Sequence, residues 1–246
     1  MLRQNSNMRK SWWKILSVIL IFYSIIAGFL LPVPKLPIVH ESIRNLYFHV
    51  PMWFTMVVLF VISTLYSIKY LRKGNLVDDV YAWAFAVVGI VFSVLGMGTG
   101  MEWAYYTWPS DQKDASMFWT GDVKQLAAAL AMLIYFAYLV LRGSIPDYDK
   151  KAKIAAVYNI FACTIMFPLI FVVPRMVDSL HPGSDGNNPA DPSRLDPIMR
   201  MIFWPAVLGW ILMGLWFTTI LIRTTLLSQK EILYADFKQK LNVFKN

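Results

Sequence analysis

The 246-residue sequence has few of the residues on which soluble enzymes and metal proteins depend. It holds one cysteine, Cys163, and three histidines, which excludes a disulfide framework and every motif built from paired cysteines. Charged residues make up 15% of the chain against 57% hydrophobic residues, and the mean hydropathy is +0.50. This balance excludes an ordinary water-soluble domain and predicts a membrane protein.

The apolar residues lie in six blocks of about 20 residues, the length that an α-helix needs to cross roughly 30 Å of hydrocarbon. The sequence therefore predicts an all-α, polytopic membrane protein that forms one integral-membrane domain, residues 1–246. The first block is too long for a signal-peptide core and lacks small residues suited to cleavage, so we expect a retained helix. The predicted spans are residues 12–31, 50–70, 80–101, 125–141, 154–173 and 201–222, followed by a polar tail, 223–246.

The net charge of +8 would suggest a nucleic-acid partner in a soluble protein, but here it indicates contact with lipid and sets the orientation. Sixteen of the 23 lysines and arginines lie on the side that carries both termini. Cytoplasmic loops are enriched in Lys and Arg, so both termini are predicted to be cytoplasmic and no nucleic-acid partner is expected. The seven on the outer side are Lys35, Arg44, Lys113, Lys124, Arg175, Arg194 and Arg200.

No Asp, Glu, Lys, Arg or His lies near the centre of a predicted span. Intramembrane ionisable groups mark proton relays and ion paths, so their absence argues against a pump and directs any chemistry to the outer face. Three glycines within residues 96–100 lie at a helix end without the strand that precedes a nucleotide-binding loop. They predict close packing between helices.

The predicted outer loop, residues 102–124, is rich in aromatic side chains. Four of them, Trp103, Trp108, Phe118 and Trp119, offer flat apolar faces on which a haem could lie. The alternative is an aromatic belt at the membrane interface, which accounts for Trp103, beside a span end, better than for Trp119.

Histidines on the same side are candidate metal ligands. His49 precedes the predicted second span by one residue, where the helix dipole favours a neutral imidazole, although such a residue can equally bond a loop carbonyl. His181 follows the fifth span, and two neutral histidines from separate segments can bind haem iron from opposite sides. A structural zinc site with His40 and Asp178 or Asp185 is the alternative.

The propionate groups of a haem require cationic partners. Three basic residues on the predicted outer face, Arg44, Lys124 and Arg175, are candidates for this contact. Each could equally be a membrane-edge residue whose charged end reaches the interface.

Several of these segments together resemble the cytochrome c biogenesis proteins of the CcmC, CcmF and CcsA group, which share an external tryptophan-rich loop. RNLYFHVPMW (44–53) resembles the first histidine motif of the CcmC family, SLHPG (179–183) the second, and MIFWPAVLGW (201–210) the start of the last helix. In the loop, Trp119 and Asp122 match a family pattern that ends in Trp-Asp-x-Arg, whereas Gly121 and Lys124 replace its Trp and Arg. Lysine keeps the charge of arginine but not its bidentate fork.

The resemblance implies that His49 and His181 are axial ligands of haem b and that the aromatic loop, with Asp122, supports the porphyrin. It also implies a bacterial inner-membrane protein that passes haem to a periplasmic haem chaperone. The implied partners are the ABC-type and small membrane subunits of the cytochrome c maturation system. Such a chain binds and transfers haem and is not an enzyme. Two alternatives are a membrane oxidoreductase subunit of cytochrome b type and a permease whose external loop binds a solute.

Overall fold

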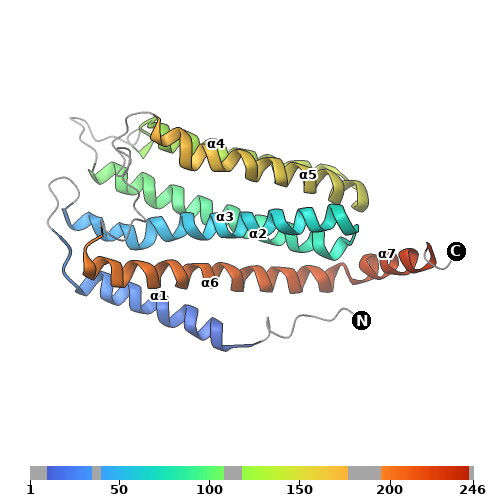
Figure 1. The fold of residues 1–246 in the computed structure, drawn as a ribbon, viewed down its shortest axis with the longest axis horizontal. Helices are drawn as coiled ribbons and strands as arrows, with labels where there is room; N and C mark the ends of the chain where they lie inside the picture. Colours follow the sequence, from blue (N-terminus) through green and yellow to red (C-terminus); the bar gives the residue numbers. More distant parts are fainter. Residues whose placement is uncertain (1–9, 35–39, 108–117, 177–194, 244–246) are drawn as a thin grey trace.

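A computed structural model describes residues 10–34, 40–107, 118–176 and 195–243, and over these residues it contains helices and no strands (Figure 1). Within these described ranges six helices are long and apolar enough to cross a membrane, which confirms the predicted all-α membrane fold. They are α1 (Trp12–Leu30), α2 (Leu46–Lys73), α3 (Leu76–Thr107), α4 (Val123–Ser144), α5 (Tyr148–Phe167) and α6 (Pro197–Ser228). A seventh helix, α7 (Lys230–Val243), follows α6 within the predicted polar tail.

The helices pack in three tiers, with α2 and α3 in the middle (Figure 1). The pair α4 and α5 covers one side of this tier, and α6 with α1 covers the other. Phe60 of α2 stacks on Tyr135 of α4 with ring centroids 3.5 Å apart, and both side chains are fully buried. The middle tier is therefore the core of the bundle, and residues on the facing sides of α2 and α3 have little access to lipid.

Polar side chains also join the helices within the apolar region. Asn159 Nδ2 of α5 donates hydrogen bonds to Ser63 Oγ at 2.7 Å and Ser67 Oγ at 2.8 Å, both on α2. Ser63 Oγ in turn donates to the carbonyl of Ala82 on α3 at 2.6 Å. Hydrogen bonds of this kind between membrane helices each contribute about 0.6 to 2 kcal/mol, so the network helps to fix α5 and α3 against α2.

Most helices extend beyond the apolar spans that the sequence predicted. A 3₁₀ helix, His40–Asn45, leads directly into α2, which begins at Leu46 and not at residue 50. Helix α3 continues to Thr107, so residues 102–107 of the predicted loop are helical. Helix α6 begins at Pro197, where the Asp196 carboxylate accepts from the backbone N–H of Ile198 at 2.8 Å. Hydropathy marks the part of a helix within hydrocarbon, whereas caps and tertiary contacts determine where it ends.

The fifth apolar block also begins and ends differently from the prediction. Asp147 caps α5 by accepting from Lys150 N at 2.7 Å, so the helix starts at Tyr148. At the other end α5 gives way to a π-helical turn, Pro168–Val172, and then to a 3₁₀ turn, Val173–Arg175. Proline lacks the N–H that would continue the regular hydrogen-bond ladder, which accounts for a break at Pro168.

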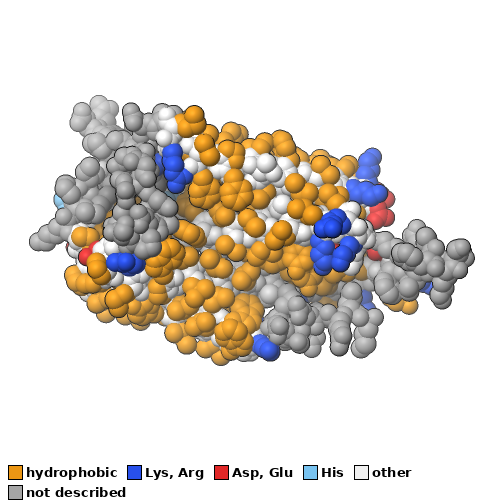
Figure 2. Space-filling view, in the orientation of Figure 1, with side chains coloured by type: hydrophobic (Ala, Val, Ile, Leu, Met, Phe, Trp, Pro, Cys, Tyr) orange, Lys and Arg blue, Asp and Glu red, His pale blue; other side chains and the backbone are white. Residues whose placement is uncertain are grey.

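One end of the bundle brings together the starts of α2, α4 and α6 and the ends of α1, α3 and α5 (Figure 1). Figure 2 shows hydrophobic side chains along the described length of the visible face, with Lys and Arg gathered toward the two ends. A buried cluster holds this end together, with members from α1, the 3₁₀ helix before α2, α2, α3 and α6. The cluster comprises Ala27, Ile43, Leu46, Tyr47, Trp103, Met199, Ile202, Phe203 and Val207.

Candidate functional site

His49 lies in the first turn of α2, at the end of the bundle just described, and only 5% of its surface is exposed. The predicted position immediately before the helix is wrong, because α2 begins at Leu46 and His49 is already helical. The ring bonds a backbone carbonyl, as in the alternative, but this carbonyl belongs to Gly96 in helix α3. The imidazole packs against α3, where it meets the segment that carries the three glycines.

The hydrogen bonds of the His49 ring determine which of its nitrogens can bind a metal. Nδ1 lies 3.0 Å from the carbonyl oxygen of Gly96 and 3.2 Å from Thr99 Oγ1. A carbonyl oxygen only accepts, so Nδ1 carries the proton in the bond to Gly96. In the neutral ring the lone pair is then on Nε2, which is the nitrogen suited to coordinate a metal.

Two glycines of α3 allow α2 to pack closely, and one of them, Gly100, forms a seat for the His49 ring, meaning that the imidazole lies directly against it. A β-carbon at Gly100 would lie 2.5 Å from His49 Cε1, and one at Gly96 would lie 2.9 Å from Cε2 of Trp53. Gly98, between them, faces open space. The predicted close packing between helices is therefore confirmed for Gly96, which contacts Trp53, and for Gly100, which contacts the candidate ligand His49.

Two tryptophans flank the histidine. The rings of Trp53 and Trp103 lie edge-on to the imidazole, with centroids 6.2 Å and 6.0 Å away. Trp103 belongs to α3, is buried, and donates from Nε1 to Ser42 Oγ at 3.0 Å, so it is not a loop residue as predicted. Trp53 was not among the predicted site residues, although its position one helical turn after His49 on α2 already places both on one face.

The remaining aromatics of the predicted loop are more exposed. Phe118 stacks on Tyr105, with centroids 4.4 Å apart and planes at 4°, and Trp119 is 44% exposed. Trp108 lies outside the described residues. Of the predicted aromatic site residues that the structure describes, Trp103 is buried beside His49, and Phe118 and Trp119 are exposed.

Asp122 has a local role that the sequence did not reveal. Its carboxylate accepts from Lys124 N at 2.8 Å and caps α4, while Gln125 Oε1 accepts from Thr120 N at 3.0 Å and Thr120 Oγ1 at 2.9 Å. Gly121 has a φ of 71°, a left-handed conformation that side chains with a β-carbon rarely adopt. The departure from the family pattern at Gly121 therefore accompanies a turn that favours glycine.

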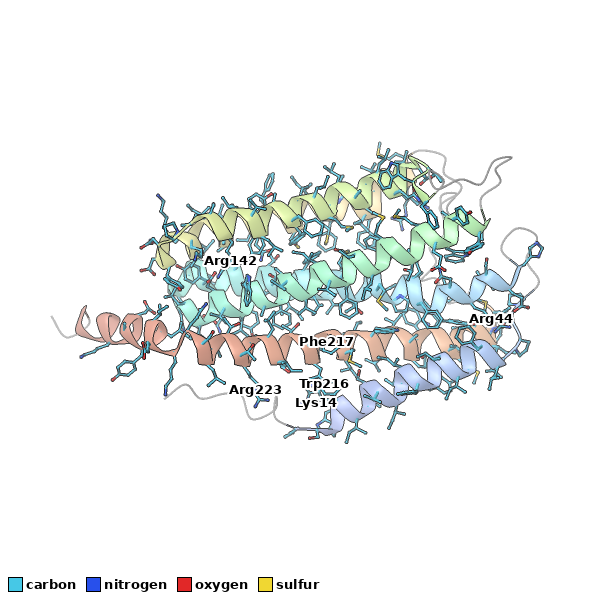
Figure 3. All side chains as sticks on the ribbon, turned by 180° about the vertical axis from the view of Figure 1, so that it is seen from behind. Lys14, Arg44, Arg142, Trp216, Phe217 and Arg223 are labelled. Carbon is cyan, nitrogen blue, oxygen red and sulfur yellow. The ribbon has the colours of Figure 1, made fainter. Side chains whose placement is uncertain are left out.

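Two of the three predicted propionate contacts have partners at helix ends. Arg44 donates from Nη1 to the carbonyls of Gly28 at 2.5 Å and Leu31 at 2.8 Å, and it forms an ion pair with Glu41 at 2.7 Å. Figure 3 shows Arg44 at this end of the bundle. Arg175 donates to the Phe171 carbonyl. Arginine near a helix C-terminus satisfies carbonyls that the helix leaves open, so both residues stabilise helix ends in this structure.

The other predicted ligands cannot be placed beside His49. His181, Asp178 and Asp185 lie outside the described residues, and His40 is exposed at the start of the 3₁₀ helix. Within the described ranges no three His, Cys, Asp or Glu side chains gather as a metal site would require. The described part of the chain therefore offers one buried imidazole, with a defined tautomer, between two indoles.

Known proteins resemble the chain over most of its length. The family model for CcmC, described as Heme exporter protein C, matches residues 2–235. Heme exporter protein C of Bradyrhizobium diazoefficiens is 26% identical over 165 residues, which cover 65% of this chain and 59% of that protein. Heme exporter protein C of Rhodobacter capsulatus is 23% identical over 189 residues, 75% of this chain and 72% of that protein.

A relative matched over a shorter stretch is the cytochrome c biogenesis protein CcsA of Trachelium caeruleum, 26% identical over 111 residues, 44% of this chain and 33% of that protein. The matches and the six apolar helices place the chain in the bacterial inner membrane as a multi-pass protein. They support a role in haem handling for cytochrome c biogenesis, in association with haem and with membrane partners. The chain belongs to the Heme exporter protein C family.

Proposed function

We propose that the chain binds haem b where α2 begins and α3 ends, and hands it to a periplasmic haem chaperone during maturation of c-type cytochromes. His49 Nε2 is one axial ligand, and His181 is the other. The observation that carries the proposal is the hydrogen bond from His49 Nδ1 to the Gly96 carbonyl, at 3.0 Å, in a chain of this family. That bond leaves the lone pair on the nitrogen that must face the iron.

The described residues suit a haem. A haem is a flat, apolar plate whose iron accepts imidazole nitrogen as an axial ligand. His49 supplies such a nitrogen, and the neighbouring rings of Trp53 and Trp103 hold the imidazole at a fixed orientation. Phe118 and Trp119 are exposed aromatic side chains that could contact the porphyrin or the chaperone.

Binding and release, without turnover of a substrate, fit this chemistry. Coordination by histidine is reversible, and the sequence has no Cys-x-x-Cys-His motif to attach haem covalently. The chain's residues then orient the iron ligand and support the porphyrin, and the chaperone removes the haem. The ABC-type and small membrane subunits of the maturation system are the proposed neighbours in the membrane.

The position of His49 within a helix is also compatible with the alternative function, an oxidoreductase subunit of cytochrome b type. Such proteins place their histidine ligands within helices, and His49 is within α2 and not before it. The position of His49 therefore does not argue against an oxidoreductase, and the match to the Heme exporter protein C family supports the proposed function. A permease that recognises a solute through its loop would carry no haem.

An absorption spectrum of the purified full-length chain tests the proposal. We expect a Soret band with the sharp visible bands of a six-coordinate, bis-histidine haem b. The haem should pass to a purified periplasmic haem chaperone on mixing. A preparation that neither retains haem nor takes it up on titration would contradict haem binding. Fast, reversible reduction by quinol without transfer to the chaperone would favour the oxidoreductase.

A further inference from the structure

A pocket of about 220 Å³ lies at the end of the bundle opposite His49. It is formed where α3 and α5 begin, where α4 and α6 end, and where α7 begins. None of the residues that line it belongs to the proposed haem site. Because most of the lysines and arginines lie at this end, it is predicted to face the cytoplasm.

The polar wall of the pocket contains a rigid cation. Arg142 of α4 forms a two-pronged ion pair with Asp79 of α3, at 2.7 Å from Nη1 to Oδ1 and 2.5 Å from Nη2 to Oδ2. Both side chains are largely buried, with 14% and 9% exposed. Figure 3 labels Arg142 near the end of the bundle where α7 leaves. This pair, together with a hydrogen bond from the guanidinium to the Tyr138 hydroxyl, fixes Arg142, and only the N–H groups that these bonds do not use can donate to a ligand.

A second cation comes from α5. Lys151 lines the pocket, and its Nζ lies 4.7 Å from the ring centroid of Tyr148. Thr225 and Gln229 add a hydroxyl and an amide at the same wall. The pocket thus contains two cations against the single carboxylate of Asp79, so it favours a negatively charged ligand.

Much of the remaining lining is apolar. This apolar part is built by side chains of α3, α4 and α7, chiefly Leu76, Val80, Leu139, Ile232 and Leu233. A volume of about 220 Å³ is below the roughly 300–1,000 Å³ of sites that enclose a drug-sized molecule. The pocket therefore suits the polar end of an amphiphile whose apolar part continues along the helices.

We propose that this pocket binds the phosphate group of an anionic phospholipid. Lys151 and Arg142 bind the phosphate, and the apolar part of the lining contacts the first part of the acyl chains. Basic pockets between membrane helices on the cytoplasmic side bind anionic headgroups in other membrane proteins, because charge and apolar contact act together there. This proposal does not rest on the proposed haem function, because the two sites share no residue.

The test compares two variants of α5 that remove the same charge. Lys151→Gln changes the pocket, whereas Lys153→Gln changes an exposed lysine two positions away that does not line it. Full-length protein is purified in a neutral detergent and titrated with phosphatidylglycerol or phosphatidylcholine, and the shift in thermal unfolding gives the affinity. Arg142 is left unchanged, because its removal would bury the Asp79 carboxylate without its partner.

We expect phosphatidylglycerol, and not phosphatidylcholine, to stabilise the wild type. Lys151→Gln should bind phosphatidylglycerol about fivefold more weakly, the effect of one lysine near an anionic surface. Lys153→Gln should match the wild type. Equal weakening in both variants, or equal stabilisation by the two lipids, would overturn the proposal. A parallel titration with inorganic phosphate separates the sources: Lys151-dependent stabilisation by phosphate alone would overturn the assignment to a lipid.

Discussion

The imidazole of His49 rests on Gly100 so closely that a β-carbon there would lie 2.5 Å from His49 Cε1. The two residues come from separate helices, α2 and α3, and from motifs that the sequence does not connect. The Gly96 carbonyl on the same helix accepts the hydrogen bond from His49 Nδ1. The orientation of the proposed iron ligand is therefore set by α3 as much as by α2.

The first prediction concerns this seat. We expect Gly100→Ala to displace the His49 ring, disturb its bond to Gly96 and weaken haem binding roughly tenfold to a hundredfold, as losses around a metal ligand do. Gly98→Ala is the matched control, since nothing lies within 4 Å of a β-carbon at that position. Haem titration followed by absorption measures both. Equal affinities in the two variants would show that the seat does not orient the ligand.

The second prediction concerns the ligands themselves. His49→Ala and His181→Ala should each lose the spectrum of a six-coordinate haem, and the double variant should retain no haem. Added imidazole should restore coordination in His49→Ala, because it can occupy the space that the side chain leaves. His40→Asn is the control: His40 is exposed, and asparagine tolerates its φ of 44°. An unchanged spectrum in the double variant would refute the ligand assignment.

The sequence predicts the membrane helices of this protein well, but it does not predict where α2 begins. The six membrane helices follow from the blocks of apolar residues and are confirmed. In lipid the backbone must satisfy its own hydrogen bonds, so an apolar segment that crosses the membrane has few alternatives to a helix. The start of α2 does not follow, because the 3₁₀ helix His40–Asn45 is held by tertiary contacts. Asn45 Nδ2 donates to the Thr99 carbonyl at 2.9 Å, and Trp103 Nε1 donates to Ser42 Oγ.

In the candidate site, too, the sequence identifies residues but not the contacts that they make. The motif around His49 identifies the residue, but the tautomer depends on Gly96, which is distant in sequence and appeared only as a helix-packing glycine. Arg44 was predicted from its charge and its position on the outer face, whereas its guanidinium donates to the carbonyls of Gly28 and Leu31 at the end of α1. Such contacts join residues whose pairing no local pattern specifies.

The third prediction separates the tryptophans by burial. Trp103→Ala removes a side chain that is 9% exposed and should lower stability by about 3–5 kcal/mol. Trp119 is 44% exposed, so Trp119→Ala should change stability by less than about 0.5 kcal/mol while weakening association with haem or the chaperone. Tyr106→Ala, an exposed aromatic at the end of α3, is the control for Trp119. Unchanged association in Trp119→Ala would assign Trp119 to the interfacial belt.

The fourth prediction asks whether Arg44 contacts a propionate in addition to fastening α1. Haem dimethyl ester lacks the propionate charges, so a propionate contact would make the wild type bind haem more tightly than its ester. Arg44→Lys should then reduce this preference, because lysine keeps the charge but loses the forked geometry. If Arg44 only fastens α1, the variant should lose stability and keep the preference unchanged. Parallel titrations with the two porphyrins distinguish these outcomes.

The last prediction concerns the turn before α4. Asp122→Ala should destabilise the chain by about 1 kcal/mol through loss of the helix cap, and Asp122→Asn should restore most of it, because asparagine also caps helices. Gly121→Trp introduces the residue that the family pattern places there, and it should destabilise by about 1–2 kcal/mol because the φ of 71° disfavours a β-carbon. Thermal unfolding measures all three. A Gly121→Trp variant as stable as the wild type would mean that the turn readily adopts another conformation, and that the turn does not require glycine at residue 121.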